Sequence, residues 1–328
     1  MVDFWTAALG LTLLLYILLD GFDLGVGILF GFVHDAKHKK QMLNSIAPVW
    51  DGNETWLVLT ASILFGAFPV VYALLLSAFY LPMILMLGAL IFRGVAFEFR
   101  EKSVTKKWLW DAGFAAGSIV ATFVQGAAVG AMVVGIPNAA GRYSGTPLGW
   151  LTPFSILCGI GLCLGYALLG ATWLVKKTEG DLRDAAYRQI VKLLIGVLAF
   201  VAIAFVFSLA MELRVMARWI ERPGLIVFPI VGILGCLLIF RGYRNRSDAL
   251  PFVGAVTLFI SAFATLAASF FPYIIPFSIT LDEAAAPHSS LSFLFWGAGI
   301  FVFPLTLIYT IAVYWLFKGK AIEEEGYD

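Results

Sequence analysis

Nine apolar segments, each long enough to cross a lipid bilayer, dominate this sequence of 328 residues. A spanning helix needs about 20 mostly apolar residues, and in lipid its backbone polar groups must be satisfied within the helix. The predicted spans are 4–33, 53–75, 77–99, 111–135, 151–175, 190–212, 224–241, 250–273 and 291–317. With 61% hydrophobic and 13% charged residues, the chain is too apolar for a soluble domain. We therefore expect an all-α integral membrane protein that forms one transmembrane domain over 1–328.

The basic residues predict how the chain is oriented. Sixteen of the 22 Lys and Arg residues lie in the C-terminal tail or in the connections after the first, third, fifth and seventh spans, counting Arg241 at the very end of the seventh span. Because positively charged loops stay in the cytoplasm, the N-terminus is expected outside and the C-terminus inside. The connection that carries Arg214, Arg218 and Arg222 departs from this pattern. The N-terminus lacks the basic region of a cleavable signal peptide, so the first segment is expected to remain as a span.

Two acids lie within the first predicted span. Asp20 falls near its middle and Asp23 one turn further along on the same face. Gly21 and Gly25 form a pair of small residues at the spacing that lets another helix approach closely. Ionisable groups at this depth are costly and are usually functional. Asp20 is therefore a candidate for a proton relay or an ion site, and the alternative is a carboxyl group that only hydrogen-bonds a neighbouring helix.

The second span begins with an unusual polar stretch, IAPVWDGNETW. Asp51 and Asn53 have side chains that can cap a helix start, and Glu54 places a negative charge at the positive end of the helix dipole. Capping is a competing interpretation of Asp51, but it does not explain the two tryptophans, of which Trp56 is the second. The stretch therefore remains a candidate for a functional site.

Charged residues also mark the inner ends of the third and fourth spans. Arg93 and Arg100 can extend toward the inner surface, and Glu98 is expected to pair with one of them. Asp111 is interpreted as the N-cap of the fourth span. The acids of the first four spans are Asp20, Asp23, Asp51, Glu54, Glu98 and Asp111. They lie between mid-membrane and the inner face, which favours conduction of protons from the cytoplasm.

The residue types needed for redox chemistry are missing from the predicted spans. The three histidines, His34, His38 and His288, lie in connections, whereas a membrane haem needs an axial ligand within the spans. The three cysteines show neither zinc-site nor redox-motif spacing, so no metal site is predicted. A net charge of +1 offers no case for nucleic acid. The residues alone favour either a proton-handling partner of another protein or a proton- or ion-coupled transporter.

Three motifs identify a resemblance. The segments LLDGFDLGVGILFGF, NSIAPVWDGNETWLV and FRGVAFEFREK closely resemble subunit II of the cytochrome bd-type quinol oxidases. The strong motifs cover about residues 17–111, and the nine-helix plan extends the likeness over the whole chain. The short length and the GNETW sequence are similar to the cyanide-insensitive branch of the family.

The resemblance implies an architecture and a set of partners. Subunit II has two four-helix bundles, here 1–135 and 151–273, and a peripheral helix, here 291–317. Its partner, subunit I, carries haems b and d and oxidises quinol, while subunit II binds no haem. The heterodimer reduces oxygen to water in the bacterial cytoplasmic (inner) membrane, and some members add a small single-helix subunit. Some also hold a structural quinone in subunit II.

The resemblance also implies roles for individual residues. Acids that match Asp20 and Asp51 lie on a proton path from the cytoplasm, and Glu98 is expected to tune its entrance. Trp56 matches a tryptophan beside an oxygen-access route. The expected supporting polar residues are Asp23, Asn53, Glu54, Arg93, Arg100 and Asp111. No catalytic residue is expected in this chain. A secondary transporter, which also places acids in the membrane, and an assembly scaffold are the alternatives.

Overall fold

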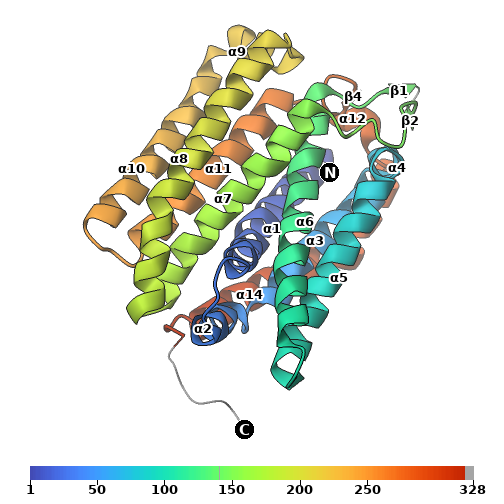
Figure 1. Ribbon diagram of the computed structural model, residues 1–328. Coiled ribbons are helices and arrows are strands. Elements are labelled where there is room, and N and C mark those ends of the chain that lie inside the picture. Colours follow the sequence, from blue (N-terminus) through green and yellow to red (C-terminus); the bar gives the residue numbers. More distant parts are fainter. Residues whose placement is uncertain (140, 322–328) are drawn as a thin grey trace.

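The computed structural model describes residues 1–139 and 141–321, and it is almost entirely helical (Figure 1). The long helices are α1 (Val2–Phe30), α3 (Trp50–Ala67), α5 (Tyr80–Lys102), α6 (Lys107–Val134), α7 (Pro153–Lys177), α8 (Gly180–Ala210), α10 (Val227–Arg244), α11 (Leu250–Phe270) and α14 (Ile300–Leu316). The shorter ones are α2 (Ala36–Ile46), α4 (Pro69–Ala78), α9 (Arg214–Glu221), α12 (Leu281–Ala284), α13 (His288–Leu294), η1 (Pro223–Ile226) and η2 (Phe295–Gly299). Two small antiparallel hairpins pair β1 (Asn138–Ala139) with β2 (Arg142–Tyr143), and β3 (Tyr273–Ile275) with β4 (Ile279–Thr280).

The helix lengths confirm a multi-pass membrane protein. Within the described residues, eight helical segments are long and apolar enough to span a membrane, and the bent pair α3 and α4 can supply a ninth. Most boundaries agree with the predicted spans to within a few residues. The largest difference is α8, which begins at Gly180 rather than at 190, because its first two turns extend the helix beyond the apolar run.

The second predicted span is interrupted. Helices α3 and α4 are bent by 120° relative to each other, at Phe68 and Pro69. Proline has no backbone N–H to continue a helix and disfavours helical geometry in the residue before it, which explains the non-helical backbone of Phe68. The short break between the second and third predicted spans is present close to Ser77: α4 ends at Ala78, Phe79 is non-helical and α5 begins at Tyr80.

One connection predicted as a basic loop contains a helix. Helix α2 begins after Asp35, whose carboxylate accepts hydrogen bonds from the backbone N–H groups of Lys37 and His38. These backbone hydrogen bonds lower the pKa of Asp35. Helix α2 contacts α7, and the indole of Trp173 donates to the carbonyl of Ser45. The connection is therefore an ordered cover over one end of the helices.

Helix α1 lies at the centre of the molecule and packs against α3, α6 and α7 (Figure 1). Its crossing with α7 depends on glycine. A Cβ on Gly25 would lie 1.8 Å from the backbone oxygen of Tyr166, and one on Gly170 would lie 2.4 Å from the carbonyl carbon of Gly25. The close approach predicted from Gly21 and Gly25 is therefore present. It brings a polar face of α1 against the other helices.

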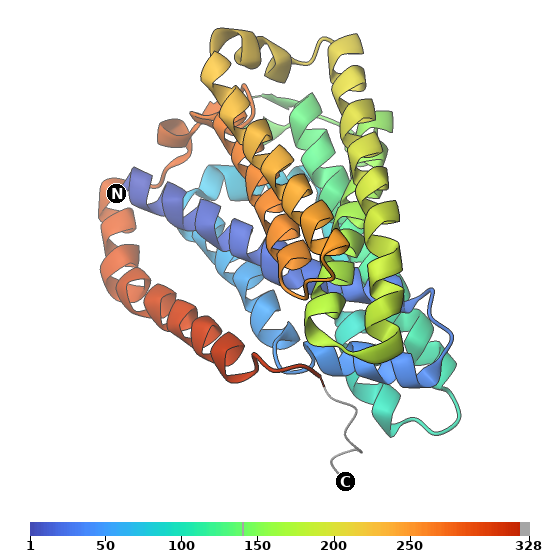
Figure 2. The same cartoon turned by 90° about the vertical axis from the view of Figure 1, so that its left-hand side faces the viewer.

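Helix α14 lies along one edge of the structure (Figure 2). None of its residues is buried, although its end makes specific contacts. Lys177 on α7 donates to the backbone carbonyls of Phe317 and Gly319. Lys320 pairs with Asp248 in the connection between α10 and α11. The last helix is thus held mainly through its C-terminal end, and the predicted grouping of the other helices into two bundles stays a prediction.

Candidate functional site

A buried ion pair lies at the centre of the polar site. Arg93 on α5 donates from Nη1 to Oδ1 of Asp20 on α1 at 2.8 Å. The side chains are 1% and 0% exposed. Two charges in so apolar a setting persist only when they compensate each other. The pair therefore links α1 and α5 and balances the charge of Asp20. Arg93 does not extend to the surface as predicted, because Asp20 holds it inside.

Glu54 joins this pair from α3. Its Oε1 lies 3.5 Å from Nη1 of Arg93, and its side chain is 27% exposed. Asp51, one turn earlier on the same helix, is exposed. The acids thus run from an exposed position at Asp51, through the half-buried Glu54, to the fully buried Asp20.

Asp23 has a different environment from Asp20. Its Oδ2 accepts a hydrogen bond from the side-chain nitrogen of Asn53 at 2.7 Å. The same nitrogen donates to the carbonyl of Leu19, and the Asn53 oxygen accepts from the hydroxyl of Tyr314 at 2.9 Å. Asp23 therefore has an amide donor beside it instead of a guanidinium. The three acids Asp20, Asp23 and Glu54, together with Arg93, are called the acid–arginine cluster below.

The acid–arginine cluster carries polar atoms without partners. Among the described residues, the buried side-chain atoms that lack a hydrogen bond include one each from Asp20, Asp23, Glu54, Arg93 and Trp56. Buried polar groups are normally satisfied by protein or by internal water. Moreover, three acids share one arginine in a site that cannot hold two uncompensated charges. The cluster therefore brings three carboxyl groups and one guanidinium together with fewer hydrogen bonds than their buried atoms can make.

The structure overturns both capping interpretations. The N-cap of α3 is Val49, with no side-chain cap hydrogen bond, and Asp51 lies within the first turn. Helix α6 begins at Lys107, so Asp111 is inside the helix rather than at its cap. Asp111 instead accepts hydrogen bonds from Lys39 at 2.8 Å and from Arg100. Asp111 thus ties α2, α5 and α6 together, whereas the capping role does not account for Asp51.

The prediction that Glu98 pairs with an arginine is wrong. Glu98 is exposed, and within the described part of the chain Arg93 pairs with Asp20 and Glu54 while Arg100 pairs with Asp111 and Glu101. Glu98 lies on the outward face of α5, because it is five residues from Arg93 and two from Arg100 along a helix. The structure therefore does not bring it into the acid–arginine cluster.

Trp56 is fully buried and packs edge-on against Phe303 of α14 at 6.3 Å between ring centroids. Tyr314 and Phe303 were both missed by sequence reasoning. They are ordinary aromatic residues in an apolar run some 250 positions from α3, so only the fold shows their role. Tyr314 is bonded to Asn53, which places α14 beside the polar site.

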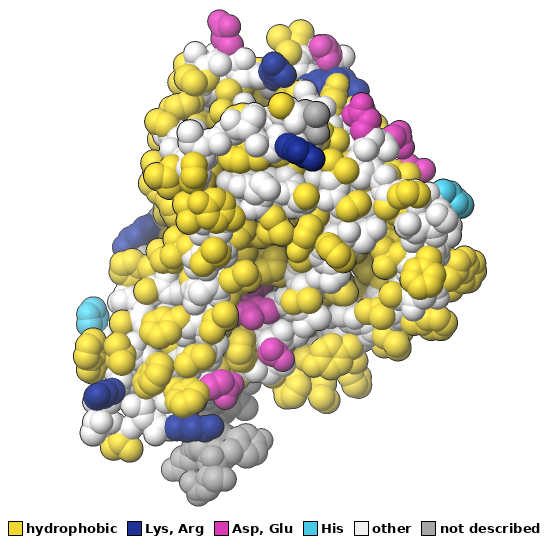
Figure 3. Space-filling model, turned by 90° about the vertical axis from the view of Figure 1, so that its right-hand side faces the viewer, with side chains coloured by type: hydrophobic (Ala, Val, Ile, Leu, Met, Phe, Trp, Pro, Cys, Tyr) yellow, Lys and Arg dark blue, Asp and Glu magenta, His cyan; other side chains and the backbone are white. Residues whose placement is uncertain are grey.

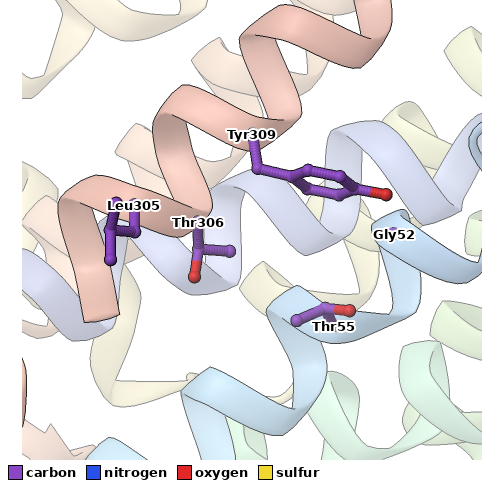
Figure 4. A pocket seen from close by; sticks show the side chains of 5 residues that line it. All are labelled: Gly52, Thr55, Leu305, Thr306 and Tyr309. Carbon is purple, nitrogen blue, oxygen red and sulfur yellow. The ribbon is translucent and has the colours of Figure 1, made fainter. Parts of the chain in front are cut away.

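A groove of about 290 Å³ separates α3 from α14. Figure 4 shows Tyr309 reaching from α14 toward Gly52, with Thr55 and Thr306 on the two sides of the space. A second, much smaller cavity is lined by Asn53 and Tyr314, among others. Figure 3 shows acidic side chains at the surface of a face that is otherwise largely hydrophobic. Glu54, whose side chain is 27% exposed, is the member of the acid–arginine cluster that reaches the surface.

The described residues offer no site for a metal ion. No group of three or more His, Cys, Asp or Glu side chains in the parts that the structure describes lies close enough to bind one. His34 follows α1, His38 lies in α2 and His288 begins α13, so none lies deep within a spanning helix. The ionisable groups that the site brings together are three carboxyl groups and one guanidinium.

The family model for cytochrome bd terminal oxidase subunit II matches residues 1–317. The chain belongs to this subunit II family. Cytochrome bd-I ubiquinol oxidase subunit 2 of Escherichia coli (strain K12) is 32% identical, and the alignment covers 98% of this chain and 95% of that protein. Cytochrome bd ubiquinol oxidase subunit 2 of Bacillus subtilis (strain 168) is also 32% identical, over 76% and 74% of the two chains.

The fold also has a match among solved structures. A chain in the structure of bd oxidase from Geobacillus thermodenitrificans superposes with a TM-score of 0.76, covering 96% of each chain at 17% sequence identity. The resemblance identified from the three motifs is confirmed. These findings support an oxidase subunit and not the transporter alternative.

Proposed function

We propose that this chain pairs with a haem-bearing subunit I to form a cytochrome bd-type quinol oxidase of the bacterial cytoplasmic membrane, and that the acid–arginine cluster supplies protons for oxygen reduction. Family membership supports the partner, since the relatives are named as second subunits of ubiquinol oxidases. In such a complex the haems of subunit I would supply the electron-transfer chemistry. The described side chains of this chain do not fit a haem, because no histidine lies deep within a spanning helix.

The orientation follows from the charged connections. Lys39, Arg100 and Asp111 meet at one end of the helices, and Lys177 and Lys320 lie where α14 ends. Under the rule that basic connections stay in the cytoplasm, this end faces the cytoplasm and the N-terminus faces outside. Asp51, at the start of α3, then lies on the cytoplasmic side and is exposed.

The single observation that carries the proton proposal is the graded burial of linked acids. Asp51 is exposed, Glu54 is half-buried with Oε1 3.5 Å from Nη1 of Arg93, and the fully buried Asp20 accepts a hydrogen bond from the same nitrogen. Asp51 accepts protons from water, and Glu54 passes them toward the interior. Arg93 keeps Asp20 charged until a proton arrives, since its positive charge compensates one carboxylate at a time.

The first experiment tests the partnership. A tag on this chain is used to purify the complex from detergent-solubilised membranes, and its absorption spectrum is recorded. Bands of b-type and d-type haem, with a second large subunit in the same peak, are the expected result. A colourless preparation after gentle extraction would contradict the proposed oxidase complex.

The second experiment tests the proton role of Asp51. Asp51→Asn keeps the size of the side chain but removes the titratable group, so oxygen consumption should fall several-fold while haem content stays near normal. Asp184→Asn is a matched control, because Asp184 is an exposed acid that pairs with the exposed Arg246. Equal activity of the two variants would refute the role of Asp51.

Family membership alone leads us to include three further features in this proposal. They are a small third subunit, a structural quinone and an oxygen route beside Trp56. Trp56 of α3 and Phe303 of α14 pack against each other, and we place the apolar oxygen route along this contact. Trp56→Ala should therefore change the apparent affinity for oxygen more than the maximal rate, and an unchanged affinity would contradict this part of the proposal.

A further inference from the structure

A second set of polar groups, two buried and one half-buried, continues from the acid–arginine cluster into the centre of the molecule. It consists of Tyr16 on α1, Gln125 on α6 and Tyr166 on α7. Tyr16 is 3% exposed and Tyr166 is fully buried. These three polar side chains come from three helices and meet inside an apolar bundle. Burying a polar side chain costs free energy unless it is hydrogen-bonded, so each of the three is expected to have a hydrogen-bond partner.

The three groups form a directed chain of hydrogen bonds. The hydroxyl of Tyr166 donates to Oε1 of Gln125 at 3.3 Å, and Nε2 of Gln125 donates to the hydroxyl oxygen of Tyr16 at 2.8 Å. The amide of Gln125 is thus oriented by Tyr166, with its nitrogen toward Tyr16. Since a tyrosine hydroxyl has one proton, and Tyr16 uses its oxygen as an acceptor here, the Tyr16 proton remains available for another partner.

The nearest group able to use that proton is Asp20. Tyr16 lies four residues before Asp20 on the same face of α1, and the two side chains interact electrostatically. One oxygen of Asp20 is bonded to Arg93, while the other, Oδ2, is buried and has no hydrogen-bond partner within the described residues. A phenol proton from one side and a guanidinium from the other would satisfy both oxygens.

The backbone of α1 leaves room for this chain of hydrogen bonds. Gly21 faces the ring of Tyr166, and a Cβ there would lie 2.7 Å from its Cε1 atom. On its other side the ring of Tyr166 stacks on Phe259 at 5.6 Å between centroids. The ring is therefore fixed between α1 and α11, which holds its hydroxyl toward Gln125.

We propose that Tyr16 is a positioning residue for proton conduction: oriented by Gln125 and Tyr166, its hydroxyl donates a hydrogen bond to the free oxygen of Asp20 and holds this carboxylate in one geometry beside Arg93. The inference rests on the proposed proton role of the acid–arginine cluster. No bond is formed or broken in Tyr16 itself. Its effect is to keep Asp20 ready to receive the proton that arrives through Glu54.

Two substitutions test the chain at separate points. Tyr16→Phe removes the hydroxyl and keeps the ring. Gln125→Glu keeps the shape but replaces the donating nitrogen with an acceptor, which draws the Tyr16 proton away from Asp20. The control is Tyr187→Phe. Tyr187 is a buried tyrosine on α8, and its hydroxyl donates to the carbonyl of Ser247 at 2.6 Å. This hydrogen bond lies outside the acid–arginine cluster.

The measurement is the rate of proton uptake during oxygen reduction by the purified oxidase, taken in water and in heavy water, with haem content measured on each sample. Tyr16→Phe and Gln125→Glu should slow uptake by about tenfold, as expected for loss of a hydrogen bond to a charged group, and should increase the solvent isotope effect. Tyr187→Phe should change neither. Uptake by Tyr16→Phe that matches Tyr187→Phe would overturn the inference.

A double mutant separates this inference from the proposal beneath it. If Tyr16 acts through Asp20, then Tyr16→Phe combined with Asp20→Asn should be no slower than Asp20→Asn alone, because interacting residues are not additive. Additive slowing would overturn the positioning role and leave the proton path intact. Normal uptake by Asp20→Asn would refute the proposed path itself, together with this inference.

Discussion

Replacing Arg93 with methionine should destabilise the protein more than any surface substitution. Arg93 is 1% exposed, and it compensates the fully buried Asp20 at 2.8 Å and the half-buried Glu54 at 3.5 Å. Methionine is similar in length and apolar, so Arg93→Met removes the charge without leaving a large cavity. What remains is a group of buried acids with no cation beside them.

The magnitude follows from the burial of the pair. Removing one partner of a buried ion pair costs about 3–5 kcal/mol, because the other charge is left uncompensated. That range corresponds to a factor of about 10² to 10³ or more in the folding equilibrium constant. Neutralising Asp20 as well, in Arg93→Met with Asp20→Asn, removes the uncompensated charge. The double variant should then lose only about 1–3 kcal/mol, the cost of unsatisfied buried polar groups.

The assay is the survival of the purified complex on heating in detergent, followed by size-exclusion chromatography with detection of protein and haem. Arg246→Met is the control, because Arg246 forms an ion pair with Asp184 in which both side chains are more than half exposed. Such a pair contributes at most about 1 kcal/mol. The expected order of stability is wild type and Arg246→Met, then the double variant, then Arg93→Met.

Either of two results would refute this reasoning. If Arg93→Met survives heating as well as Arg246→Met, the buried pair does not stabilise the fold. If the double variant is less stable than Arg93→Met alone, the loss comes from packing or hydrogen bonds and not from an uncompensated charge on Asp20.

Three further predictions concern other parts of the fold. Gly25→Ala should abolish assembly, since its Cβ would lie 1.8 Å from a backbone oxygen, whereas Gly10→Ala, with nothing within 4 Å, should assemble normally in the same purification. Lys177→Met should release the end of α14, because Lys177 binds two backbone carbonyls there, and limited proteolysis should then cut the C-terminal segment faster than in wild type. Burial raises the pKa of Asp248, but hydrogen bonds from Lys320 and a neighbouring arginine outweigh it and hold the pKa below its ordinary value. The ionised Asp248 therefore stabilises the attachment of α14 fully above about pH 4, and this stabilisation is lost as the pH falls below that value. Asp248→Asn should remove this acid-dependent part of the stability.

The helices were largely predictable, because a membrane leaves few choices for a long apolar segment. Asp20 and Asp23 were found as candidates for the same reason, since an acid in such a segment is conspicuous. The sharp bend at Pro69 was missed because the residues around it are apolar on both sides, so hydropathy shows no boundary there. Only the backbone effect of proline interrupts the helix.

The partners within the site were less predictable. Arg93 looked like a residue that extends to the surface, since it lies near the inner end of its span, but its neighbours across the bundle are acids. Asp111 looked like a cap, yet α6 begins four residues earlier, and its carboxylate instead binds Arg100 and Lys39. In both cases the local sequence allowed two roles, and contacts between distant helices decided between them.

The contribution of Tyr314 shows the same limit. Its hydroxyl reaches Asn53 over a separation of 261 residues, and nothing in the apolar run around it marks one tyrosine as different from the others. A pairing between α3 and the last helix depends on the whole fold. Physical rules for single segments therefore identify which acids lie unusually deep in apolar segments, but not which groups surround them.

The central claim is that protons reach Asp20 from the cytoplasm through Asp51 and Glu54. The most direct test is proton uptake by the oxidase in proteoliposomes, measured in the first turnover with a pH-sensitive dye, for Glu54→Gln beside Asp184→Asn. Glu54→Gln keeps the size of the side chain and removes the only acid that contacts Arg93 from α3. Uptake several-fold slower than in Asp184→Asn, with unchanged haem content, is the predicted result. Uptake at the wild-type rate would contradict the account.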